Sequence, residues 1–170
     1  MVYCEERPED EVVRDLNGAR SIIMVGCAGC ANTSVYLQNA PDGSAMMTLT
    51  ATGFHPVAMK DAMDRLVRLL SDKGLRVASY LGKYPTGLLC VPDNRGRAKL
   101  MKKCRGCDTV ITLCCDGGTR SMENLLKGKK IIPAMKAGGL ITATMKSNRL
   151  FTKFFIEKDS VDIVKFTIPD

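Results

Sequence analysis

The hydrophobic positions of this chain follow two patterns, continuous apolar runs and stretches with helical spacing. A continuous apolar run is typical of a strand buried on both faces of a parallel sheet, and one lies at residues 21–25. Further strands are predicted over residues 75–81, 109–113 and 130–134. Helical spacing is clearest over residues 59–71, where apolar side chains recur three or four positions apart. Shorter helices are predicted over residues 8–19, 32–37, 97–104 and 119–126.

The strands and helices therefore alternate along the chain. This order predicts an α/β fold, with an open, mostly parallel four-stranded sheet and helices on both faces, Rossmann-like or flavodoxin-like. Residues 46–52 fit a short strand or a covering loop. The alternating pattern after residue 150 predicts a C-terminal hairpin or edge strands. We expect residues 1–149 to form a cysteine-rich metal- or cluster-binding domain, and residues 150–170 to be a β extension packed on that domain or on a partner.

Composition narrows the functional class. The chain has 170 residues, 45% of them hydrophobic, which suits one domain. No apolar run approaches the ~18 residues of a membrane span, and the N-terminus lacks a signal-peptide pattern, so we expect a cytoplasmic protein.

The net charge of +7 is unevenly distributed, because residues 91–158 hold 15 Lys and Arg against 5 Asp and Glu. Such a stretch binds an acidic partner or an anionic cofactor, or is an ordinary solvated surface. It lacks the aromatic interleaving and motifs of nucleic-acid binding.

Eight cysteines are the strongest chemical signal in the sequence. A disulfide framework requires an oxidising compartment, so metal or cluster ligation is the better interpretation, with scattered core thiols as the alternative. The single histidine, His55, argues against a Cys/His zinc finger. All-thiolate sites suit iron–sulfur clusters or a zinc ion held by four cysteines. The eight are Cys4, Cys27, Cys30, Cys90, Cys104, Cys107, Cys114 and Cys115.

Several of these thiols follow predicted strands. Cys27 and Cys30 come after the first strand, Cys90 lies in the loop after the second, and Cys114 and Cys115 follow the third. The C-terminal ends of parallel strands share one edge of a sheet. We therefore expect four or five thiols to meet at this edge.

The C-x-x-C motif of Cys27 and Cys30 has three interpretations: cluster or metal ligation, dithiol redox chemistry, or structural thiols. Glycines let the backbone approach a bulky sulfide and donate N–H groups to it. The candidate cofactor-binding positions are accordingly Gly26, Gly29, Gly117 and Gly118. The Gly-rich segments at residues 115–118 and 137–139 are predicted as turns that bind phosphate or simply reverse the chain.

A second C-x-x-C, Cys104 and Cys107, precedes the third strand and is expected at the opposite edge. It would hold a second metal with Cys4 as a further ligand, hold a metal at an interface, or consist of two unligated thiols. The chain has no paired-carboxylate site and no Ser–His–Asp set, so no catalytic residues are assigned. This favours a non-catalytic subunit over an independent enzyme.

Three segments resemble a known family. They are Val-Gly-Cys-Ala-Gly-Cys-Ala at residues 25–31, Leu-Leu-Cys at 88–90, and Asp-Thr-Val-Ile-Thr-Leu-Cys-Cys at 108–115. Their order and spacing resemble the C-terminal-domain family of methylenetetrahydrofolate reductase over roughly residues 21–139. This family includes the cysteine-rich accessory subunit of the flavin-bearing, acetogen-type reductase, and its members are zinc or iron–sulfur proteins. The resemblance implies that Cys27, Cys30, Cys90 and Cys115 are the ligands of one site, with Cys114, Cys104 and Cys107 as weaker candidates.

These observations predict an iron–sulfur accessory subunit with one [4Fe–4S] cluster. It would relay electrons to or from a larger redox enzyme, such as a flavin-dependent methylenetetrahydrofolate reductase in the one-carbon metabolism of an anaerobe. Two alternatives stay open at this point. One is a zinc–thiolate protein with a structural or methyl-transfer role, and the other is a small cluster-dependent enzyme.

Overall fold

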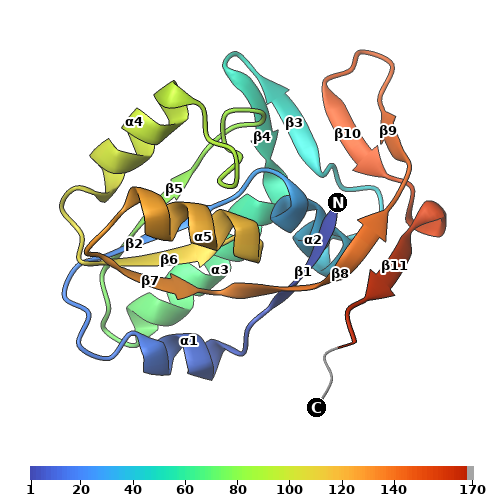
Figure 1. Cartoon of the computed structure of the whole chain (residues 1–170). Helices are drawn as coiled ribbons and strands as arrows, with labels where there is room; N and C mark the ends of the chain where they lie inside the picture. Colours follow the sequence, from blue (N-terminus) through green and yellow to red (C-terminus); the bar gives the residue numbers. More distant parts are fainter. Residues whose placement is uncertain (168–170) are drawn as a thin grey trace.

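A parallel sheet lies at the centre of the molecule (Figure 1). The computed structural model describes residues 1–167. The central strands run in the order β5-β2-β6-β7 and are all parallel. Every residue of β2 and β6 is buried, as their continuous apolar runs require. The four strands are β2 (Ile22–Gly26), β5 (Val77–Leu81), β6 (Thr109–Leu113) and β7 (Lys130–Pro133).

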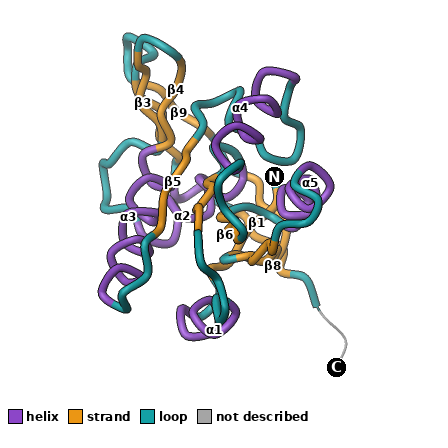
Figure 2. The backbone as a smooth tube through the Cα atoms, turned by 90° about the vertical axis from the view of Figure 1, so that its left-hand side faces the viewer, coloured by secondary structure: helices purple, strands orange, loops and turns teal. Residues whose placement is uncertain are grey.

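Helices cover both faces of this sheet. Figure 2 shows α3 on one side, and α4 and α5 on the other. The apolar stripe of α3 buries Met59, Met63 and Leu70 against the sheet and against α2. A short helix, α1, contacts the far strand β7. The helices are α1 (Glu9–Asp15), α2 (Cys30–Asn39), α3 (Val57–Asp72), α4 (Asn94–Cys104) and α5 (Asp116–Leu125).

Two antiparallel sheets flank the central one. The first has the order β1-β8-β11 and the second β4-β3-β10-β9. A single 3₁₀ turn, Lys158–Ser160, precedes β11 among the described residues. The strands of the first sheet are β1 (Val2–Glu6), β8 (Met135–Thr142) and β11 (Asp162–Lys165). Those of the second are β3 (Met47–Thr50), β4 (Gly53–Pro56), β9 (Met145–Ser147) and β10 (Lys153–Ile156).

The predicted open, mostly parallel, Rossmann-like sheet is therefore wrong. Two of the three sheets are antiparallel, and the parallel strands make up only one of them. The flanking strands are short or half-exposed, so they lack the continuous apolar run that marks a central strand. Some of them pair with segments that lie far away in the chain, such as β1 with β8 and β3 with β10, and no local pattern encodes this pairing.

The Gly-rich segment at residues 137–139 is also not a turn. It lies inside β8, which follows β7 almost at once. A Cβ on Gly139 would overlap the Val164 backbone of β11, with Lys165 Cα only 2.9 Å away. This glycine serves the close approach of two strands, a role that sequence alone does not distinguish from a turn.

The C-terminal segment joins both antiparallel sheets. β10 lies between β3 and β9, whereas β11 pairs with β8, so the two strands do not form a hairpin with each other. Residues 168–170 of the predicted extension lie outside the described residues. The undecided stretch at residues 46–52 forms β3, which pairs with β4. Within residues 1–167, none of the helices has the length and apolar character needed to cross a bilayer.

Gly26 tests how tightly the end of β2 packs. A Cβ there would overlap the Met63 sulfur and lie 2.9 Å from Leu81 Cδ1. We expect Gly26→Ala to lower the free energy of unfolding by about 1–3 kcal/mol, because core overpacking displaces α3. Gly106→Ala is the matched control, since nothing lies within 4 Å of its Cβ position. Urea unfolding measures both variants, and equal stabilities would contradict the packing described here.

Candidate metal centre

The parallel strands β2 and β6 end side by side, and each leads directly into cysteines. Cys27 follows β2, and its N–H donates to the Leu113 carbonyl at the end of β6 at 3.0 Å. Cys30 is the first residue of α2, and Cys115 is the N-cap residue of α5. Both helices therefore begin with a thiol at the C-terminal edge of the sheet.

The loop after β5 carries Cys90 to the same edge. The Ala28 N–H donates to the Gly87 carbonyl at 3.1 Å, which ties this loop to the Cys27 loop. A Cβ on Gly87 would lie 2.5 Å from the carbonyl carbon of Gly82, so the loop folds back on itself without room for a side chain. The Cβ position of Gly117 lies 3.9 Å from Cys90 Cβ and 3.8 Å from Cys115 Sγ. Cys90 and Cys115 are thus neighbours.

Cys4 belongs to the same group, contrary to the expectation that it joins Cys104 and Cys107. Its N–H donates to Ser34 Oγ at 2.9 Å, and that hydroxyl donates to the Cys30 carbonyl at 2.9 Å. Burial raises the pKa of the Cys4 thiol, and the nearby Cys115 and Cys30 raise it further. The sequence gives no signal for this placement, because it depends on the pairing of β1 with β8. We call Cys4, Cys27, Cys30, Cys90 and Cys115 the thiol cluster.

Backbone amides stabilise charge on two of these sulfurs. Burial raises the pKa of Cys27 to about 11, while the N–H groups of Leu89 and Gly29 lower it and the thiols of Cys90 and Cys115 raise it. Burial and then Cys115 raise the pKa of Cys90, opposed by its own N–H and that of Val91. Amide donors of this kind favour thiolates once a cation compensates the charge.

Cys114 lies near Cys4, Cys27 and Cys115, but its sulfur makes its hydrogen bond within the core. Its Sγ lies 3.4 Å from Thr119 Oγ1, which is 3.0 Å from Thr112 Oγ1. A Cβ on Gly118 would lie 2.8 Å from this sulfur. Burial raises the pKa of Cys114 to about 12, partly offset by the hydrogen bond to Thr119. The contacts describe a core thiol between β6 and α5.

The four candidate glycines differ in their surroundings. Gly117 lies between Cys90 and Cys115, whereas Gly26 packs against α3 and Gly118 against Cys114. A Cβ on Gly29 would lie 2.6 Å from Leu88 Cδ2 and 3.8 Å from Cys27 Sγ. Gly29 and Gly117 are therefore the two that border the thiol cluster.

The second C-x-x-C lies at the other edge of the sheet. Cys104 ends α4 and Cys107 precedes β6, so both are at the N-terminal end of a strand whose C-terminal end carries Cys114 and Cys115. Among the described residues, no three His, Cys, Asp or Glu side chains converge closely enough to hold one metal ion. Ligation at the thiol cluster therefore requires side-chain rotation from these positions.

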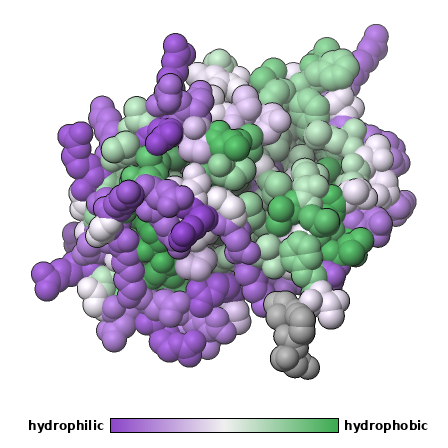
Figure 3. Space-filling model, viewed as in Figure 1, coloured by the Kyte–Doolittle hydropathy of each residue, from purple (hydrophilic) through white to green (hydrophobic). Residues whose placement is uncertain are grey.

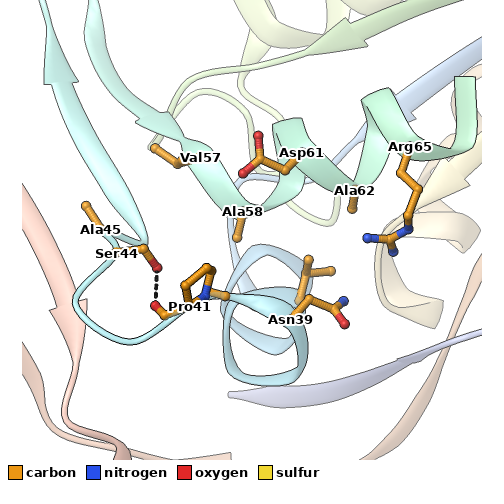
Figure 4. A pocket seen from close by; sticks show the side chains of 11 residues that line it. Asn39, Pro41, Ser44, Ala45, Val57, Ala58, Asp61, Ala62 and Arg65 are labelled. Carbon is orange, nitrogen blue, oxygen red and sulfur yellow. Dashed lines mark hydrogen bonds between the residues drawn. The ribbon is translucent and has the colours of Figure 1, made fainter. Parts of the chain in front are cut away.

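A small cavity elsewhere has no connection to these thiols. It has a volume of about 120 Å³ and lies between the end of α2, the loop that follows and the start of α3 (Figure 4). Asp61 and Arg65 lie at its border, and the Ser44 hydroxyl donates to the Pro41 carbonyl at 2.6 Å beside it. No cysteine lines it.

In comparisons with known proteins, no family model, curated protein or solved structure matched this chain. The resemblance to the methylenetetrahydrofolate reductase family therefore stays a prediction.

The pKa of Cys27 makes stability depend on pH in the metal-free chain. The folded value of about 11 exceeds the ordinary value of 9.0, so the unfolded chain loses this proton first. The protonated Cys27 thiol contributes about 2–3 kcal/mol to the free energy of unfolding. This contribution is fully present below pH ~9 and is lost as the pH rises towards ~11. Urea unfolding at several alkaline pH values measures the decline. Cys27→Ala is the control for other titrating groups, and an equal decline in that variant would contradict the assignment.

Proposed function

We propose that this chain is a non-catalytic iron–sulfur subunit. It binds one [4Fe–4S] cluster through Cys27, Cys30, Cys90 and Cys115, and relays electrons to or from a larger redox enzyme. The gathering of five thiols at one edge of the parallel sheet carries this proposal. Cys4 is a buried thiol beside these four.

The donor set suits such a cluster. Cysteine thiolates are the ligands of iron–sulfur clusters, and hydrogen bonds to the sulfurs and solvent exposure set the potential. Backbone N–H groups partly offset the rise that burial causes in the pKa of Cys27 and Cys90. Cys27 is 3% exposed and Cys115 7%, whereas Cys90 is open to solvent. When bound, the cluster supplies a one-electron couple. The chain's residues hold it, shield one side from water and leave the Cys90 side accessible.

The exposed side of Cys90 suits an acidic partner. Cys90 lies in an open depression of about 500 Å³ that Arg97 and Arg120 border. Hydrophilic side chains cover the α4 and α5 side of the molecule in Figure 3. Electron transfer requires a short distance between centres, so a partner that docks here approaches the cluster closely. The predicted partner is a flavin-bearing reductase, on the basis of the family resemblance.

An apolar surface offers a second contact for that partner. Leu140 on β8 and Val164 on β11 are cross-strand neighbours, 52% and 61% exposed. Hydrophobic side chains gather at the right of Figure 3, over the antiparallel strands. Adjacent exposed apolar residues are typical of interaction sites.

Metal analysis tests the cluster. We expect about four iron and four sulfide per chain after purification without oxygen, with a broad absorption near roughly 400 nm. Cys27→Ser and Cys115→Ser should lose most of the iron, because each removes a ligand. Cys104→Ser is the matched control at the opposite edge and should keep it. Stoichiometric zinc in a colourless protein would contradict the proposal and favour the zinc–thiolate alternative.

Charge reversal tests the docking surface. We expect Arg97→Glu with Arg120→Glu to slow the oxidation of the reduced protein by an anionic one-electron complex such as hexacyanoferrate, roughly 3- to 10-fold at low salt. Stopped-flow absorbance measures this rate. Arg14→Glu on α1 with Lys73→Glu at the end of α3 controls for net charge, because it changes the charge by the same amount. An equal effect of the control would show that electrons do not leave beside Cys90.

A further inference from the structure

The second C-x-x-C brings two unlike thiols together. Cys104 is fully buried at the end of α4, whereas Cys107 is half-exposed. The Cys107 thiol donates to the Cys104 carbonyl at 3.0 Å. The intervening Arg105 and Gly106 form a turn, and an i, i+3 turn of this kind places two Cα atoms within disulfide range.

Cys107 faces a basic depression. Together with Gly106 it lines an open hollow of about 430 Å³, which Arg20, Arg76 and Lys103 border. The Lys129 ammonium donates to the Cys107 carbonyl. The acidic group beside it, Asp108, accepts the N–H groups of Arg20 and Ser21 at 3.2 and 3.3 Å. Cations therefore outnumber carboxylates around the accessible sulfur, and this favours an anionic reactant.

The surroundings also distinguish the two sulfurs. Burial raises the pKa of Cys104 to about 11, Cys107 raises it further and Lys129 lowers it. The pKa of Cys107 is also raised, because burial and then Asp108 outweigh Lys129 and the hydrogen bonds that lower it. Cys107 is nevertheless the sulfur that solvent reaches and that lines the basic depression, and this assigns it the nucleophilic role.

We propose that Cys104 and Cys107 form a thiol–disulfide exchange site for small disulfides that carry carboxylates, the class to which oxidised glutathione belongs. The Cys107 thiolate attacks one sulfur of the small disulfide, breaks its S–S bond and releases one thiolate. Cys104 then attacks the Cys107 sulfur of the mixed disulfide and displaces the second thiolate. The two protons of Cys104 and Cys107 end on the two released thiols. The protein dithiol is oxidised and the small disulfide is reduced.

The position on the fold favours a slow and stable switch. Redox-active C-x-x-C motifs that lie at a helix N-terminus stabilise the thiolate and hence the reduced form. Here Cys104 ends a helix, where the backbone carbonyls disfavour negative charge. The reduced form is not stabilised in this way, so the disulfide persists once formed. This site is separate from the thiol cluster, and its test does not depend on the cluster.

Peptide mapping tests the exchange. The full chain, purified without oxygen, is incubated with oxidised glutathione, alkylated and digested with trypsin. Cleavage after Lys103 and Arg105 separates the two cysteines, so their disulfide links Cys104-Arg105 to the peptide of residues 106–120. Because that peptide also contains Cys114 and Cys115, Cys107→Ser is the control and should abolish the linked pair. Cys104→Ser should instead accumulate glutathione on Cys107. The absence of both products in the folded protein would overturn the proposal.

The preference for an anionic disulfide is tested by comparing the rates at which an anionic and a cationic disulfide react. We expect Arg76→Gln with Lys103→Gln to slow the reaction with oxidised glutathione roughly 3- to 10-fold at low salt, because the depression loses two cations. The rate with cystamine, a cationic disulfide, should be unchanged or faster. Arg149→Gln with Lys73→Gln, at two exposed residues outside the depression, is the matched control. Equal slowing with both disulfides would contradict selection of an anion.

Discussion

The hydrogen bond from the Cys27 N–H to the Leu113 carbonyl joins the ends of the two most buried strands. It requires β2 and β6 to stop at the same level, so the loops that follow them begin side by side. A second hydrogen bond, from Ala28 to Gly87, adds the loop after β5. The three loops that carry cysteines therefore meet at the C-terminal edge of the parallel sheet, and the proposed cluster depends on this alignment. A shift of either strand by one residue would turn its side chains to the opposite face.

The two edges of the parallel sheet impose different chemistry on the same residue type. At the C-terminal edge, α2 begins with Cys30 and α5 follows Cys115, and helix N-termini stabilise negative charge on groups placed there. At the N-terminal edge, α4 ends with Cys104, where the helix has the opposite effect. One fold thus places thiols at helix N-termini at one edge and at a helix C-terminus at the other. The direction of the helices, rather than the C-x-x-C spacing, makes the difference.

The antiparallel sheets add a buried thiol and an exposed apolar pair to the features of the parallel sheet. Pairing with β8 places β1 beside α2, and this brings Cys4 to Cys30 through Ser34. The outer face of the same sheet presents Leu140 and Val164 as adjacent apolar residues. These strands thus add Cys4 to the cysteine-rich edge and leave an apolar pair exposed.

The sequence by itself determined the elements whose pattern is local. The apolar run of β6 and the helical stripe of α3 give strong periodic signals, because each depends on burial of one segment alone. The approach of Cys90 to Cys115 also follows from strand order, since parallel strands end at one edge. Only the tertiary structure decided the position of Cys4, the hydrogen bond of Cys114 to Thr119 and the basic depression beside Cys107. The first and the last depend on contacts between segments distant in the chain. The alternation after residue 150 indicates strands but does not reveal that β1 and β11 both pair with β8.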